Sequence, residues 1–182
     1  MIKEVIRTKM RRLRRDLTSE QVREYSKIIQ YKLESRKAFK EAETIMLYIS
    51  FAKEPETLPI IEKILSEGKK VVVPVSNLST NTIIPTYING VDELIPGAYG
   101  ILEPTIIRAV NPMDIDLVVI PGIAFDMHRN RLGFGMGYYD KFLATTEAAR
   151  IALCYDFQVV DDLPTNELDI PMDLILTEKG EI

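Results

Sequence analysis

The residues best suited to chemistry lie in one stretch, 121–140, which follows an apolar run and is rich in glycine. Gly133, Gly135 and Gly137 alternate directly before a helical pattern. Because glycine has no Cβ, such a loop can bring several backbone amides close to one anion, and the amino terminus of the next helix adds favourable partial charge. The stretch matches neither a Walker A motif nor a dinucleotide fingerprint. The spacing predicts a phosphate site, with a tight structural turn as the alternative.

Charged side chains extend this prediction. Asp140 falls in the first turn of the expected helix, where a carboxylate either stabilises the helix end or, beside a polyphosphate, holds magnesium. Near the amino terminus, cations three or four residues apart form one stripe: Lys3, Arg7, Arg11 and Arg14. The stripe is either a phosphate-binding surface or a solvated helix face.

The other reactive residue types, histidine and cysteine, give little indication of a functional site. His128 is expected in a surface turn with little catalytic role, because no serine or cysteine nucleophile motif accompanies it. Cys154 lies in an apolar run and is expected to be buried and inert. One histidine and one cysteine cannot supply a structural zinc site, so any metal should be a hard, oxygen-bound cation such as magnesium.

Periodic patterns predict the elements that position these side chains. Helices are expected at 2–17, from the Thr18 and Gln21 capping box onward, at 58–67 and at 138–145. Strands are expected at 44–50, 70–75, 83–88, 116–121, 150–155 and 173–177, with an irregular connection over 85–112. Alternation of strands and helices predicts an α/β three-layer sandwich with a parallel or mixed central sheet. The glycine-rich loop follows one strand at its carboxyl end, where such sheets bind ligands.

Composition limits the class of protein. The 182 residues, 46% hydrophobic and 27% charged, suit a single α/β domain over 1–182 in which basic helices from 2–40 pack on the sheet. Apolar runs too short for a membrane span and a basic amino terminus without a secretory pattern predict a cytoplasmic protein. Residues 1–40 carry 13 Lys and Arg against 5 Asp and Glu, whereas the rest is acidic. An RNA-binding arm is disfavoured, because 3–17 contains no aromatic residue for base stacking.

The ordered motifs resemble the 5-formyltetrahydrofolate cyclo-ligase family across nearly the whole chain. The central match consists of Pro121, Gly122, Phe125, Asp126, Arg131 to Gly133, Gly135 and Gly137 to Asp140. The outer matches are Lys3 with Arg7, Glu54 to Thr57, Gly100 to Pro104, Asp169, Asp173 and Thr177 with Glu178. Four residues depart from the family pattern: Arg129 stands where glycine is common, Val75 where a basic residue is common, and Pro55-Glu56 where Val-Asp is commoner.

The resemblance implies ATP-dependent cyclisation of 5-formyltetrahydrofolate to 5,10-methenyltetrahydrofolate, through a phosphorylated formyl group, with release of ADP and phosphate. It also implies a fold similar to the sugar-phosphate isomerase and CoA-transferase group, ATP as co-substrate, and Mg²⁺. Small molecules are the expected partners, with neither nucleic acid nor membrane, and the chain is expected to be a monomer or a weak homodimer. The nearest alternative is a sugar-phosphate isomerase or acyl-CoA enzyme on a similar fold, which would turn over without ATP.

Roles carry over from the resemblance residue by residue. The expected catalytic residues are Arg131 and Tyr138, and the expected metal ligands are Asp140 and Asp169. Substrate contacts are expected from Ile49, Phe51 and Glu54. The expected nucleotide-binding residues are Lys3, Arg7, Arg131, Leu132, Gly133, Phe134, Gly135, Met136, Gly137, Tyr138 and Tyr139.

Overall fold

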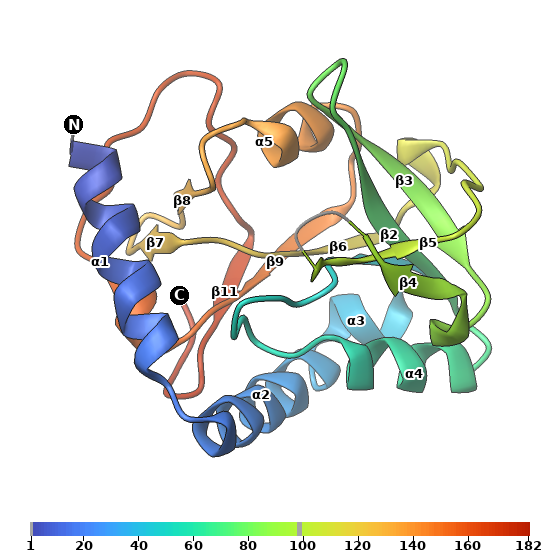
Figure 1. The fold of residues 1–182 in the computed structure, drawn as a ribbon, viewed down its shortest axis with the longest axis horizontal. Coiled ribbons are helices and arrows are strands. Elements are labelled where there is room, and N and C mark those ends of the chain that lie inside the picture. The colour runs from blue at the N-terminus through green and yellow to red at the C-terminus, as the bar shows by residue number, and fades with distance from the viewer. Residues whose placement is uncertain (1, 98–99) are drawn as a thin grey trace.

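The computed structural model describes residues 2–97 and 100–182, and a six-stranded sheet forms its centre (Figure 1). The strands run in the order β11-β9-β6-β1-β2-β3. Their bounds are β1 Thr44–Leu47, β2 Lys70–Asn77, β3 Thr82–Ile88, β6 Leu117–Ile120, β9 Ala149–Leu153 and β11 Leu174–Leu176. All neighbouring strands are parallel except β2 and β3, which pair antiparallel. The predicted mixed α/β sheet is therefore confirmed.

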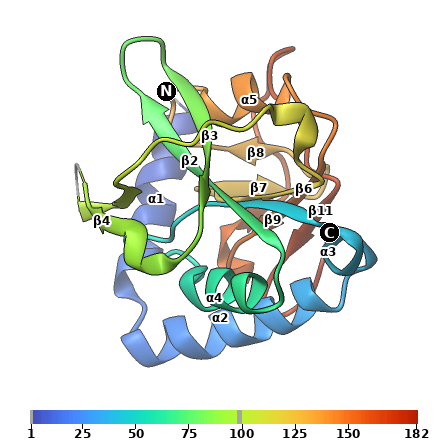
Figure 2. The same ribbon diagram turned by 90° about the vertical axis from the view of Figure 1, so that its right-hand side faces the viewer.

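Both faces of the central strands are buried, which explains their nearly continuous apolar sequences. One face packs against three helices: α2 Ser19–Glu34, α3 Lys37–Glu41 and α4 Leu58–Ser66 (Figure 2). The opposite face packs against the short helix α5 Tyr138–Leu143 through Phe142 and Leu143. Alternate residues of one strand serve the two faces, as Val118 and Val119 of β6 do. These are the three layers that the sequence predicted.

The first helix, α1 Ile2–Asp16, does not pack on the central sheet, contrary to the expected placement of residues 2–40. Its Met10 packs with Ile123, Ala124 and Leu132 in a separate apolar cluster. That cluster covers a second sheet of order β10-β7-β8, made of β7 Ala124–Asp126, β8 Arg131–Leu132 and β10 Val159–Val160. Ile2 and Val5, at the start of α1, are 69% and 65% exposed and do not belong to this cluster.

Several boundaries differ from the sequence expectation. The first strand ends at Leu47 rather than at residue 50, because the carbonyl oxygen of Tyr48 accepts the Thr57 hydroxyl instead of continuing the ladder. The α5 helix ends at Leu143, two residues early. The stretch 85–112 is less irregular than expected, since β4 Leu94–Pro96 pairs antiparallel with β5 Leu102–Pro104. Among the described residues, no helix is long and apolar enough to span a membrane.

Candidate functional site

A contact between α1 and the glycine-rich loop brings the two basic regions of the chain together. The Nε of Arg7 donates a hydrogen bond to the carbonyl oxygen of Gly133 at 2.9 Å, across 126 residues of sequence. Arg7 also pairs with Glu4 at 3.0 Å. A Cβ on Gly135 would lie 3.5 Å from the Arg7 guanidinium, so the loop backbone approaches the helix closely. The structure thus joins the cationic stripe to the predicted phosphate loop.

Arg131 lies at the centre of this junction and is 9% exposed. Its Nη2 donates to Asp140 Oδ2 at 3.0 Å, and its guanidinium lies 5.3 Å from the centre of the Tyr139 ring. Its buried Nε has no hydrogen-bond partner within the described parts of the chain. A buried guanidinium N–H without an acceptor is costly, so this atom is suited to an oxygen that a ligand supplies.

The two carboxylates predicted as metal ligands both pair with cations. Asp140 binds Arg131 and also accepts the amide of Ile170 at 3.3 Å, which places it next to the segment of Asp169. Asp169 pairs with Lys3 at 3.3 Å. No group of three or more metal-ligand side chains occurs over 2–97 and 100–182. Two carboxylates still fit magnesium, which in phosphate sites usually takes one or two carboxylates together with phosphate oxygens and water.

The backbone of the loop has the conformation that its glycines allow. Gly135 and Gly137 have φ of 110° and 69°, a region that residues with a Cβ rarely adopt. A Cβ on Gly133 would lie 2.8 Å from Arg131 Nη1, so the absence of a side chain there leaves room for the guanidinium. Gly137 directly precedes α5. Loop residues Phe134 and Met136 are exposed.

A second loop, 48–57, follows β1 and faces the glycine-rich loop. The rings of Phe51 and Phe134 stack with centres 5.7 Å apart, and Arg11 lies 5.9 Å from the Phe134 ring centre. Ala52 and Lys53 between the predicted substrate residues have positive φ of 47° and 60°, so this loop turns sharply. Ile49 and Glu54 are buried. The predicted folate and nucleotide residues therefore lie on adjoining loops.

Glu54 is a buried carboxylate, only 3% exposed. Its Oε2 accepts the Phe51 amide at 3.2 Å, while its Oε1 lies 3.6 Å from Arg14 Nη1. Burial raises the pKa of Glu54 to about 7, although Arg14 and the Phe51 amide act in the opposite direction. Buried, ionisable groups of this kind with strongly perturbed pKa values are concentrated at functional sites.

The remaining predicted residues have varied positions. The Tyr138 hydroxyl donates to Asn81 Oδ1 at 3.4 Å, which links α5 to the turn between β2 and β3. Leu132 is buried in the cluster with Met10, so its side chain is part of the core and only its backbone could meet a nucleotide. Burial raises the pKa of Tyr139, so its phenol stays neutral.

The sequence did not predict the burial of Arg14. Its spacing places Arg14 in the cationic stripe, yet this residue is 5% exposed and faces Glu54.

The turn 126–130 departs from the family pattern in sequence but keeps a left-handed residue. Arg129, which stands where the family often has glycine, adopts φ 65° itself. His128 is exposed in a turn, as expected. That turn is organised by the buried Asp126, which accepts the amides of His128 and Asn130 at 2.9 Å.

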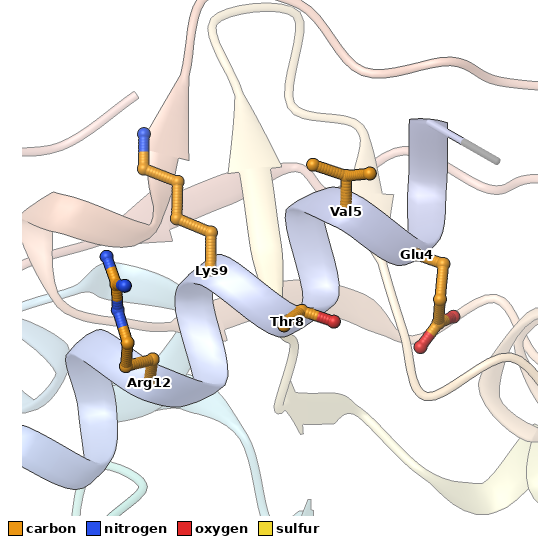
Figure 3. A pocket seen from close by; sticks show the side chains of 5 residues that line it. All are labelled: Glu4, Val5, Thr8, Lys9 and Arg12. Carbon is orange, nitrogen blue, oxygen red and sulfur yellow. The ribbon is translucent and has the colours of Figure 1, made fainter.

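A hollow on the outer side of α1 lies apart from these residues (Figure 3). It is lined by five exposed side chains of one helix: Glu4, Val5, Thr8, Lys9 and Arg12. None of the residues predicted to bind substrate or metal lines it. We therefore place the candidate site at the junction of the two loops with the other side of α1.

The chain is similar in sequence and in fold to known proteins of one family. The chain matches the sequence model of the 5-formyltetrahydrofolate cyclo-ligase family over residues 1–178. It is 31% identical to the 5-formyltetrahydrofolate cyclo-ligase of Escherichia coli K12, covering 92% of this chain and 96% of that protein. The Aquifex aeolicus 5,10-methenyltetrahydrofolate synthetase structure is 35% identical, with a TM-score of 0.88, covering 100% of this chain and 92% of that one. The Mycoplasma pneumoniae 5,10-methenyltetrahydrofolate synthetase is 25% identical, with a TM-score of 0.80, covering 98% and 99%.

Proposed function

The chain belongs to the 5-formyltetrahydrofolate cyclo-ligase family, enzymes that form 5,10-methenyltetrahydrofolate, and we propose that it works by phosphoryl transfer from ATP at the junction of α1 with loop 133–137. The observation that carries this proposal is the arrangement of three cations: Arg7 and Arg131 lie against that loop, and Lys3, on the same helix as Arg7, pairs with Asp169. Phosphoryl transfer depends mainly on positioning and on charge stabilisation, so a cluster of cations and accessible amides suits it better than a nucleophilic triad would.

The chemistry begins at the formyl oxygen, which is a poor leaving group. That oxygen attacks the γ-phosphorus of ATP, the bond to the β–γ bridging oxygen breaks, and ADP leaves. The folate N10 then adds to the activated formyl carbon and loses its proton, and the C–O bond breaks with release of phosphate. Lys3 and Arg7 bind the phosphates, and the partnerless Nε of Arg131 donates to an oxygen of the transferring group. Tyr138, at the start of α5, borders the reacting groups.

Magnesium, when bound, supplies charge neutralisation on the phosphate oxygens. Asp140 and Asp169 would hold it, because Asp140 follows the glycine-rich loop and accepts the amide of Ile170, the residue next to Asp169. Their ion pairs with Arg131 and Lys3 orient both carboxylates before the nucleotide arrives. In this proposal Arg131 and Lys3, which pair with the two carboxylates, also bind phosphate oxygens of the nucleotide.

The folate ring occupies the second loop. Glu54 Oε1, buried and without a hydrogen-bond partner among residues 2–97 and 100–182, accepts hydrogen bonds from the amino and ring N–H groups of the pterin. Ile49 and Phe51 provide apolar and aromatic contact beside it. The stack of Phe51 on Phe134 connects this loop to the nucleotide loop, so the formyl group and the γ-phosphate meet between them.

A coupled assay tests this function. Purified protein, magnesium, ATP and 5-formyltetrahydrofolate are mixed, and methenyl product and phosphate are followed together. We expect one phosphate for each product and no product when ATP is omitted. Methenyl product formed without ATP would reject the phosphoryl mechanism and favour a related enzyme that needs no nucleotide. The single-domain organisation, the cytoplasmic location and the monomeric or weakly dimeric state remain predictions from the sequence.

A further inference from the structure

Arg14 is a buried cation on the helix that carries Lys3 and Arg7. It follows Arg7 by seven residues, which is two helical turns, so both side chains leave the same side of α1. The side chain of Arg14 is only 6% exposed, although the neighbouring Arg12 and Arg15 are exposed. Burying a guanidinium costs free energy unless a partner compensates for the lost hydration. The carboxylate of Glu54 is that partner.

The contact between the two groups is close without being a hydrogen bond. Arg14 Nη1 lies 3.6 Å from Glu54 Oε1, and this oxygen has no hydrogen-bond partner in the described part of the molecule. The other oxygen already accepts the Phe51 amide. The arginine therefore attracts the carboxylate electrostatically and leaves the acceptor capacity of Oε1 unused.

The other titratable groups around Glu54 are phenols and one carboxylate. Tyr48 follows β1, Tyr155 follows β9, and Tyr139 belongs to α5; each interacts electrostatically with Glu54. Burial raises the pKa of all three phenols, so they stay neutral at neutral pH. Glu56, beside Tyr155, is an acid and does not favour ionisation of Glu54. Arg14 is the cation that opposes the cost of ionising this buried carboxylate.

We propose that Arg14 is a positioning residue for folate binding, which keeps Glu54 ionised and its Oε1 available to the N–H donors of the pterin. This inference rests on the proposed function, because it assigns Arg14 to the folate half of the same site. One face of α1 then serves both substrates, with Lys3 and Arg7 at the phosphate end and Arg14 at the pterin end. Lys3 and Arg14 are separated by about 16 Å along the helix axis.

The inference has a definite pH dependence. Only the ionised carboxylate can accept two hydrogen bonds from adjacent donors, so folate affinity should fall as the pH drops through the pKa of Glu54, about 7. Because the positive charge of Arg14 lowers that pKa, its removal should raise it. The midpoint of the affinity profile should then move upward by about one pH unit or more.

The test measures the dissociation constant of 5-formyltetrahydrofolate without ATP, from pH 6 to pH 9, for the native chain and three variants. Arg14→Met removes the charge but keeps much of the volume, whereas Arg14→Lys keeps the charge. Arg12→Met is the matched control, because it removes a charge from the exposed side of the same helix. We expect the Arg14→Met midpoint to rise and its affinity to approach the native value at pH 9. Arg14→Lys should restore much of the native profile, and Arg12→Met should reproduce it.

Two results would overturn the inference in different ways. If the native chain binds folate and Arg14→Met shows the same midpoint, Arg14 does not control Glu54, while the proposed function stands. If the native chain binds no folate at any pH, the proposed function fails and the role of Arg14 fails with it. A carboxyl ¹³C titration of Glu54 reads the same effect without folate, in the native chain and in Arg14→Met. A higher midpoint in the variant supports the inference, and an equal midpoint contradicts it.

Discussion

At the scale of single residues, Arg131 is held ready for a ligand by contacts that leave one donor free. Asp140 binds one terminal nitrogen, and the Tyr139 ring lies beside the guanidinium plane. Gly133 has no side chain that would displace it. Such an arrangement costs little reorganisation when charge develops on a phosphoryl group, which is how fixed cations lower a barrier.

Arg131→Ala should therefore lower kcat more than it raises the KM for ATP. We expect a loss in kcat of about 100-fold or more, the range typical for removal of a group that acts in the transition state. Steady-state assays of methenyl product and phosphate measure both parameters. Arg12→Ala, an exposed arginine outside the site, is the control. A raised KM with unchanged kcat would show that Arg131 contributes only ground-state binding.

At the scale of elements, the clearest hydrophobic patterns in the sequence predicted strands that the structure confirms. The apolar runs around Val72, Val118 and Ile151 form strands because both of their faces are buried. The short strands β7, β8 and β10 were not predicted, because two or three residues give no measurable alternation. Their pairing depends on tertiary contacts, such as the packing of Met10 against Leu132.

The candidate site was likewise predicted from the sequence only in part. Residue types and order predicted the glycine loop and its acids, and the structure places these next to Lys3 and Arg7. The burial of Arg14 could not be predicted, since its spacing is equally that of a solvated stripe and its partner lies 40 residues away on another loop. A helix pattern shows which residues share a face, but not what that face meets.

The junction of α1 and α2 offers a test of local structure. The Thr18 hydroxyl accepts the Gln21 amide at 3.1 Å, and the Gln21 side chain accepts the Thr18 amide at 2.8 Å, forming the predicted capping box. Thr18→Ala should lower the free energy of unfolding by about 1 kcal/mol. Urea unfolding should show a lower midpoint at unchanged slope, with kcat and KM unaltered. Thr80→Ala, in the exposed turn after β2, is the control. An equal loss of unfolding free energy in the two variants would show that the capping box does not stabilise the fold.

At the scale of the whole molecule, the parallel sheet and α1 together assemble the site. Strands β1, β6 and β9 are parallel neighbours, so the loops that follow them, which contain Glu54, Arg131 and Tyr155, meet at one edge. The α1 helix covers that edge by packing on the second sheet, and α2 continues from it onto the central sheet (Figure 1). The basic amino-terminal region is thereby placed over an acidic body, at the edge where we propose that the phosphates bind.

This assembly includes a carboxylate whose ionisation opposes folding. Burial raises the pKa of Glu54 from 4.5 to about 7, so between these values the folded chain binds more protons than the unfolded chain. The contribution of Glu54 to stability is then fully present below pH 4.5 and is lost as the pH rises to about 7.

Glu54→Gln removes this titration while keeping the size of the side chain. The difference in unfolding free energy between variant and native chain should therefore move in favour of the variant by about 2 to 3 kcal/mol between pH 5 and pH 8. Urea unfolding at several pH values measures it, and folate affinity should fall in the same variant. Glu62→Gln, which changes an exposed glutamate of α4 in the same way, is the matched control. A constant difference across this range would show that Glu54 ionises as readily in the folded protein as in the unfolded chain, and that burial does not raise its pKa.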